Sequence, residues 1–282
     1  MKKLRQVLCL TILCGTLISA CLDNESSEQQ NDTVALLDSN SKGVLVIAMG
    51  GYLSCPSGNI YRATHRHQMN NLENHILNAG IDFKGISSCY DVTMDLPDTV
   101  QIHYTLSDGT VYYSGLETFM KRILDEISRY PNYDVYMMGH SHGGWLSMKF
   151  LANVQLPRQI KYYVSVDPIS RGECPPMVYL RTTSRLVLNP ELNPCIRFPR
   201  DISENELKTI NLQTELWDNY YQRATQKLMS NATEAANNVQ VLYPIERLLK
   251  PLPNSAHFRI WTDSEVWDNL KSKILTVGNG SQ

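Results

Sequence analysis

The sequence lacks two features that would have widened the range of functions. Its 26 basic residues nearly balance 28 acidic ones, and no stripe of lysine and arginine interleaved with aromatic residues occurs after residue 5. Nucleic-acid binding depends on such a basic surface, so we expect no nucleic-acid partner. There is also no linker inside the main part of the chain, which favours one domain over residues 42–282.

The N-terminal apolar run is too short to be a membrane anchor. It covers residues 7–18, whereas a transmembrane helix needs roughly 20 apolar residues. The basic residues at positions 2, 3 and 5 precede it, which is the arrangement of a secretory signal peptide. We therefore predict a signal peptide over residues 1–20.

The end of this segment suggests a lipid-modified protein. Ile18-Ser19-Ala20-Cys21 resembles the bacterial lipobox, in which the signal is cut before the cysteine and the thiol carries lipid. The resemblance implies a lipid on Cys21 that anchors the protein to a membrane of the bacterial cell envelope. Residues 21–41 are polar and would form a disordered tether. An ordinary signal peptide cut after Ala20, or nearby, is the alternative.

The cysteines outside the signal peptide and Cys21 are even in number and have no Cys-x-x-Cys spacing. The missing spacing argues against a metal site, and an even number in an oxidising compartment predicts two disulfides. Pairs that close local loops are favoured, which gives Cys55 with Cys89 and Cys174 with Cys195. We expect neither a metal nor a cofactor.

The pattern of apolar residues predicts a doubly wound α/β fold. A continuous apolar strand over 43–49 ends in two glycines, and helical and extended segments then alternate along the chain. Such alternation favours a mostly parallel sheet with helices on both faces. The predicted helices are 66–79, 116–130, 144–153 and 264–275, and the other extended segments are 83–90, 101–113, 133–138, 162–166 and 239–242. Residues 171–240 are less regular and are expected to form a cap or insertion over the sheet.

One pentapeptide lies where a nucleophile would be presented. Gly139-His140-Ser141-His142-Gly143 falls between a predicted strand and a predicted helix. This is the context that a nucleophile elbow requires, with the serine on a strained turn and glycines allowing close approach of the chain. A helix N-terminus directly after Ser141 would also favour a developing negative charge. We predict Ser141 as a nucleophile.

A nucleophilic serine needs a base and a carboxylate that orients the base. His142 and His257 are the only histidines downstream of Ser141, and His142 is too close in the chain to act from a separate loop. His257 is therefore the predicted base.

Several carboxylates could orient His257. Asp167 ends the predicted strand 162–166 and precedes a proline, so it would lie at the same sheet edge as Ser141. Glu215, Asp218 and Asp201 remain alternatives in the irregular region, whereas Asp263 is better placed to cap the last helix.

An oxyanion hole would require two backbone N–H groups near Ser141. The residue after the nucleophile, His142, would supply one. The other would come from the loop after the early strand, where Gly51 and Tyr52 are the candidates.

Three motifs together resemble serine lipases and esterases of the α/β-hydrolase superfamily. They are Gly-His-Ser-His-Gly-Gly at 139–144, Val-Asp-Pro at 166–168, and Ala-His-Phe-Arg-Ile around His257. The resemblance implies the α/β-hydrolase fold and favours Asp167 as the acid, because the lipase branch carries its acid in a similar Asp-Pro step. It does not extend to residues 171–240.

The function implied is a membrane-tethered hydrolase that cleaves a small-molecule or lipid ester through an acyl-enzyme. An acyltransferase or thioesterase with the same triad is one alternative. A surface-binding lipoprotein without catalysis is another, since a fold does not determine a function. The oligomeric state stays open.

Overall fold

The computed structural model describes residues 43–52, 54, 60–90, 102–174, 194–224, 228–243 and 255–278. The predicted signal peptide, the predicted tether with Cys21, and Cys55 lie outside the described residues.

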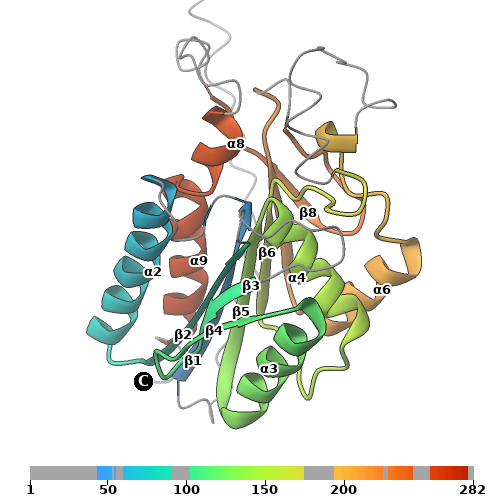
Figure 1. The fold of residues 1–282 in the computed structure, drawn as a ribbon. Coiled ribbons are helices and arrows are strands. Elements are labelled where there is room, and N and C mark those ends of the chain that lie inside the picture. The colour runs from blue at the N-terminus through green and yellow to red at the C-terminus, as the bar shows by residue number, and fades with distance from the viewer. Residues whose placement is uncertain are drawn as a thin grey trace, which may run out of the picture. The chain divides into compact units, whose positions relative to one another are not determined.

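The described strands form one eight-stranded sheet in the order β4-β3-β2-β1-β5-β6-β7-β8 (Figure 1). In this spatial order, each pair of neighbours from β2 through β1 to β8 is parallel. The strands β3 and β4 form a hairpin that adds to the edge at β2 in antiparallel orientation. The strand β1 lies between β2 and β5, in the middle of the sheet. The bounds are β1 Gly43–Tyr52, β2 Asp82–Tyr90, β3 Ile102–Thr105, β4 Val111–Ser114, β5 Tyr133–His140, β6 Tyr162–Val166, β7 Trp217–Tyr221 and β8 Asn237–Gln240.

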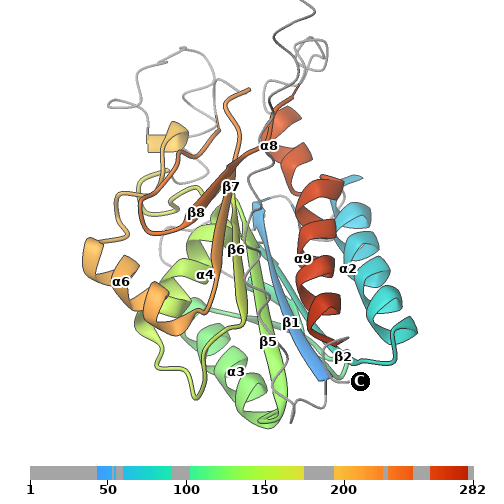
Figure 2. The ribbon, with the colours of Figure 1, turned by 180° about the vertical axis from the view of Figure 1, so that it is seen from behind.

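Helices cover both faces of this sheet (Figures 1 and 2). Even-numbered residues of β1 lie in one apolar cluster with α2 and α9, and odd-numbered residues lie in another with α3 and α4. This explains why the β1 sequence is apolar at consecutive positions. The predicted doubly wound α/β fold is confirmed. The helices are α2 Ile60–Asn78, α3 Leu116–Arg129, α4 His142–Asn153, α6 Glu204–Gln213, α8 Ser255–Ile260 and α9 Ser264–Gly278, with a 3₁₀ turn η1 at Pro194–Ile196.

The prediction of a cap over residues 171–240 needs a correction, because β7, β8 and α6 lie in this segment and belong to the core architecture. The strand β7 was not recognised because it carries polar residues inside the sheet. Asp218 accepts hydrogen bonds from Tyr162 Oη at 2.5 Å and from Asn237 Nδ2 at 2.9 Å, and Asn219 is fully buried. Paired polar groups can be buried at low cost, so this strand lacks an apolar pattern.

The helix α6 packs beside α4 and begins with a capping box. The Ser203 side chain accepts from the backbone N–H of Glu206, whose carboxylate accepts from the backbone N–H of Ser203. The same glutamate forms a 2.8 Å ion pair with Lys149 of α4. None of the described helices is both long and apolar enough to span a membrane.

Candidate active site

Ser141 is the single residue between β5 and α4, at the sharp turn predicted from the pentapeptide. Its backbone has φ 57° and ψ −126°, a conformation that is costly for a residue with a side chain. Two glycines make the turn possible. A Cβ on Gly139 would lie 2.5 Å from the carbonyl oxygen of Gly143, and a Cβ on Gly143 would overlap the carbonyl oxygen of Met49.

The structure brings Ser141, His257 and Asp167 into one chain of hydrogen bonds. The Oγ of Ser141 lies 2.9 Å from Nε2 of His257, and Nδ1 of His257 lies 2.7 Å from Oδ2 of Asp167. The exposed fractions are 4 %, 1 % and 0 % for the serine, histidine and aspartate. With Nδ1 donating to the carboxylate, Nε2 carries the lone pair and can accept the serine proton, as a general base must.

Asp167 follows β6 and receives two further donors. Gln222 Nε2 donates to Oδ2 over 2.8 Å, and the backbone N–H of Ser230 donates to Oδ1. These supporting residues were not predicted, because Gln222 and Ser230 lie far from Asp167 in the chain. Asp167 also has a positive φ of 42°. Among the residues that the structure describes, Ser141 and Asp167 are the two non-glycine residues with positive φ.

The alternative carboxylates have other partners. Glu215 forms a 2.7 Å ion pair with Lys161, Asp218 accepts from Tyr162, and Asp201 accepts from the indole N–H of Trp145 at 2.9 Å. The remaining candidate, Asp263, accepts at 3.1 Å from the backbone N–H of Glu265 in the first turn of α9, as an N-terminal cap does.

Gly51 lies directly against Ser141. A Cβ on Gly51 would be 2.5 Å from Cβ of Ser141 and 3.0 Å from its Oγ, so only glycine fits here. The Gly51 carbonyl accepts from the backbone N–H of Ser54 at 3.2 Å and from its hydroxyl at 2.5 Å. Because C=O and N–H point in opposite directions across a trans peptide, these bonds fix the direction of the Tyr52 N–H. The other predicted donor, the His142 N–H, is in the first turn of α4, where backbone N–H groups have no partner within the helix.

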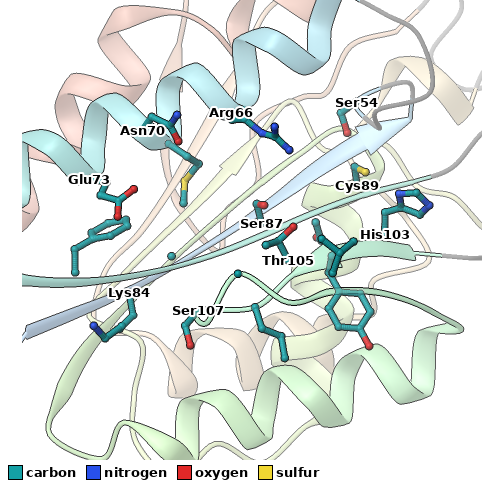
Figure 3. Close-up of a pocket in the computed structure, with 18 of the residues that line it drawn as sticks. Ser54, Arg66, Asn70, Glu73, Lys84, Ser87, Cys89, His103, Thr105 and Ser107 are labelled. Carbon is teal, nitrogen blue, oxygen red and sulfur yellow. The ribbon is translucent and has the colours of Figure 1, made fainter.

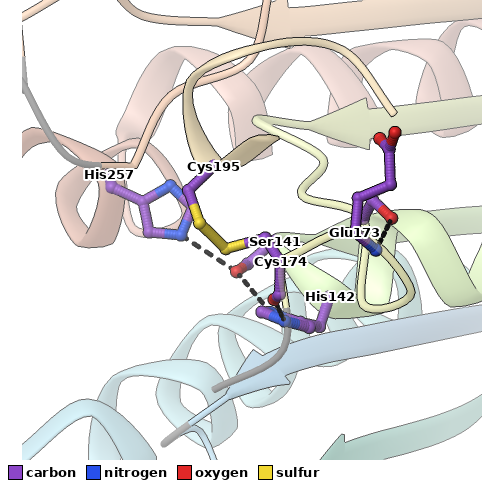
Figure 4. Close-up of a disulfide and its surroundings, with 7 residues drawn as sticks. Ser141, His142, Glu173, Cys174, Cys195 and His257 are labelled. Atoms are coloured by element: carbon purple, nitrogen blue, oxygen red, sulfur yellow. Dashed lines mark hydrogen bonds between the residues drawn. A yellow bond between two sulfur atoms is a disulfide. The ribbon is translucent and has the colours of Figure 1, made fainter. Parts of the chain in front are cut away.

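The side chain of His142 also reaches Ser141, although the sequence indicated a role for its backbone alone. Its Nδ1 lies 3.4 Å from Oγ of Ser141, and its Nε2 donates to the carbonyl of Cys174 over 3.0 Å (Figure 4). Burial lowers the pKa of His142 from 6.5 to about 4, since removal from water disfavours the charged form.

The histidine that precedes Ser141 supports the segment that carries His257. His140 is buried, and its Nε2 donates to the backbone carbonyl of His257 over 2.8 Å. Its ring also stacks on Trp261, with 5.3 Å between centroids. These contacts hold α8 and the residue after it against β5 and so fix the position of His257.

The predicted disulfide between Cys174 and Cys195 is present. Both half-cystines are buried in a small apolar cluster with Ile169 and Leu228. Cys89 is also disulfide-bonded, while its predicted partner Cys55 lies outside the described residues. That second pairing stays a prediction.

A separate cavity of about 1090 Å³ opens beside α2, over the face formed by β2, β3 and β4 (Figure 3). Its lining is part apolar and part polar, and the polar side chains include Arg66, Glu73, Lys84 and Thr105. Ser54 also lines it, so the cavity reaches the residue that holds the Gly51 carbonyl. The residues of the Ser141 hydrogen-bond chain are not part of its lining.

The comparisons with known proteins find similar solved structures but no match by sequence. No family model and no curated protein matches the sequence. The ydeN gene product of B. subtilis is 12 % identical, with 82 % of this chain and 98 % of that chain covered and a TM-score of 0.46. The Pyrococcus furiosus esterase Pf2001 is 13 % identical, with 79 % and 80 % covered and a TM-score of 0.39. Est1E from Butyrivibrio proteoclasticus is 15 % identical, with 83 % and 89 % covered and a TM-score of 0.40.

The class of fold follows from this chain itself. A mostly parallel sheet is covered on both faces, a serine occupies a strained turn between a strand and a helix, and the order along the chain is Ser141, Asp167, His257. These features define the α/β-hydrolase fold. The predicted fold is thereby confirmed.

Proposed function

We propose that this protein is a serine hydrolase that cleaves carboxylic esters, with Ser141 as nucleophile, His257 as base and Asp167 as the acid that orients the base. The observation that carries the proposal is the buried chain of hydrogen bonds from Ser141 Oγ through His257 to Asp167, at 2.9 and 2.7 Å. An isolated serine hydroxyl is a weak nucleophile at neutral pH, and a base at this distance activates it.

The proposed reaction has two halves. In the first, His257 Nε2 takes the proton of Ser141 Oγ as this oxygen attacks the ester carbonyl, and the resulting imidazolium then protonates the leaving alcohol. In the second, His257 takes a proton from water, which attacks the acyl-enzyme and releases the acid. Asp167 stays ionised and stabilises the imidazolium in both halves.

The negative charge of each tetrahedral intermediate would be held by backbone N–H groups. His142 would supply one from the first turn of α4, and the end of β1 at Gly51 and Tyr52 would supply the other. Such donors act strongly in a site shielded from water, because they are oriented before the charge develops. The tight contact between Gly51 and Ser141 supports this assignment.

The proposed location is the bacterial cell envelope, with the domain anchored through lipid on Cys21. The support is the sequence Ile18-Ser19-Ala20-Cys21 and the polar stretch that follows it. A tether would keep the domain at a membrane surface, where esters of lipids and of small molecules are both within reach.

A fluorophosphonate probe tests the catalytic proposal directly, because it labels activated serines. Purified wild-type domain should be labelled and should hydrolyse chromogenic esters, whereas Ser141→Ala should do neither. A series of esters of increasing acyl length then defines the substrate class, and added alcohols reveal any acyl transfer. An unlabelled wild-type protein, or labelling that persists in Ser141→Ala, would refute the proposal.

A further inference from the structure

The disulfide between Cys174 and Cys195 is connected to the nucleophile through one side chain. The carbonyl of Cys174 accepts a hydrogen bond from Nε2 of His142, and Nδ1 of the same ring lies 3.4 Å from Oγ of Ser141. Figure 4 shows the imidazoles of His257 and His142 approaching this oxygen from different directions. The serine hydroxyl is thus bordered by two rings, of which one belongs to the proposed triad and the other is held by the disulfide-bonded turn.

The hydrogen bond to Cys174 fixes the chemical state of His142. A carbonyl oxygen can accept but cannot donate, so the ring proton is on Nε2 and Nδ1 is an acceptor. The ring is buried, and its lowered pKa of about 4 keeps it neutral near neutral pH. Since the serine hydroxyl has one proton, it donates to one imidazole at a time. The shorter contact, at 2.9 Å, is to His257, which is the productive orientation.

The turn that presents the Cys174 carbonyl is well anchored. Its backbone closes with a 3.0 Å bond from the N–H of Cys174 to the carbonyl of Ser170. The carboxylate of Glu173 pairs with Arg197 at 3.0 Å and accepts from the N–H of Arg200 at 3.1 Å. The disulfide adds a covalent link to the same neighbouring segment. Loss of the disulfide would therefore loosen this turn without releasing it completely.

We propose that His142 is a positioning residue that couples the Cys174–Cys195 disulfide to Ser141, so that turnover depends on the disulfide being oxidised. This inference rests on the proposed hydrolase function. Reduction by an external dithiol transfers two electrons and two protons to the cystine, which gives two thiols, while the dithiol closes to its own disulfide. The loosened turn then holds the His142 ring less firmly, and the ring no longer confines the Ser141 side chain to the rotamer that points its hydroxyl toward His257.

A second route from the disulfide leads to the acid instead. The carbonyl of Cys195 accepts at 3.1 Å from the N–H of Met229, and the next residue, Ser230, donates its N–H to Asp167. Effects carried by this route would not pass through His142. A double-mutant comparison separates the two routes, because coupled residues give non-additive effects.

The experiment measures kcat, KM and the rate of fluorophosphonate labelling for the wild type, His142→Ala, His142→Gln and the double variant Cys174→Ser/Cys195→Ser. All variants keep the backbone N–H at position 142. We expect kcat and the labelling rate to fall about tenfold in His142→Ala and in the double variant with little change in KM, since small displacements of a reacting group cost up to about 10² in rate. Glutamine can still donate to the Cys174 carbonyl, so His142→Gln should keep most of the wild-type kcat and labelling rate.

The combined variant, which carries His142→Ala together with Cys174→Ser and Cys195→Ser, should have a kcat no lower than that of His142→Ala alone. A further tenfold loss there would assign the effect to the route through Asp167 and overturn the coupling, as would an unchanged kcat in His142→Ala.

His75→Ala, on the exposed surface of α2, is the matched control and should behave as wild type. If the cysteine variant does not fold, wild type and His142→Ala are compared before and after treatment with dithiothreitol, with opening of the Cys174–Cys195 bond checked by alkylation of the freed thiols. Because Cys89 is also disulfide-bonded, a Cys89→Ser variant shows what loss of that bond contributes. A wild type that does not react with the probe overturns both the function and this inference, whereas equal labelling of wild type and His142→Ala overturns the inference alone.

Discussion

Replacement of Asp167 by asparagine tests the part of the site that the sequence left most open. The carboxylate accepts from three donors, with His257 Nδ1 and Gln222 Nε2 on one oxygen and the Ser230 N–H on the other. An asparagine offers one oxygen and one NH₂ group. If its oxygen faces Ser230, the NH₂ group faces His257 and forces the ring proton onto Nε2, which can then no longer accept the proton of Ser141.

The opposite orientation of the asparagine leaves its NH₂ group facing the Ser230 N–H in a buried position, at a cost of about 1–3 kcal/mol. The first orientation in turn sets the NH₂ group against the NH₂ group of Gln222, so either orientation leaves two donors facing each other. The first holds His257 in the inactive tautomer, and in both the charge that stabilises the imidazolium is lost. Loss of the correct tautomer in a serine triad lowers kcat by about 10⁴, which corresponds to about 5 kcal/mol in the activation barrier. We expect this loss in kcat for a chromogenic ester, with KM nearly unchanged.

Asp218→Asn is the matched control, because it changes another buried aspartate on the neighbouring strand β7. This carboxylate accepts from Tyr162 and Asn237 and has no contact with the proposed triad. The Asp218→Asn variant should have a lower melting temperature than wild type, while its kcat stays within a few-fold of wild type. Near wild-type kcat in Asp167→Asn, or an equal loss in folded Asp218→Asn, would refute the assignment of the acid.

Three further predictions concern other parts of the chain. Gly51→Ala should lower kcat by roughly 10², measured with the same ester, because its Cβ would collide with Ser141; normal kcat would exclude the end of β1 from the oxyanion hole. Because the folded pKa of His142 is depressed to about 4, its contribution to stability is complete above pH 6.5 and is lost as the pH falls toward 4. His142→Gln should therefore remove up to about 3 kcal/mol of acid sensitivity in denaturation curves over that interval, and unchanged acid sensitivity would contradict the burial argument. Cys21→Ser should release the protein from the membrane fraction, and unaltered fractionation would exclude a lipid anchor at this residue.

The parts of the fold that could be predicted are those whose residues show a local pattern. The strand β1 is apolar at every position from 44 to 49 because both of its faces are buried. The strand–serine–helix sequence around Ser141 identified the turn, and His257 followed because no other suitable histidine lies downstream. By contrast, β7 carries buried polar side chains whose partners come from β6, β8 and α9. Such a strand has no pattern until its neighbours are in place.

The same limit applies to the site. Gln222 and Ser230 hold Asp167, and His140 holds the backbone of His257. Each contact joins segments that meet only because the sheet brings the carboxyl ends of its strands together. Nothing in the spacing of these residues along the chain distinguishes them from ordinary polar residues. The three members of the proposed triad could be inferred from residue type and chain order, whereas the groups that orient them depend on the tertiary structure.

The two strained residues of the site are linked through the backbone as well as through His257. The N–H of Ser141 donates to the carbonyl of Val166 at 3.0 Å, and the N–H of Ile169 donates to the carbonyl of Ser141 at 3.1 Å. These bonds extend the parallel pairing of β5 and β6 past the ends of both strands. Strained conformations of this kind cost about 1–3 kcal/mol each and persist only where surrounding contacts determine them. Because each turn is hydrogen-bonded to the other, neither can relax alone, and the separation of Ser141 and Asp167 is set by the spacing of two adjacent strands.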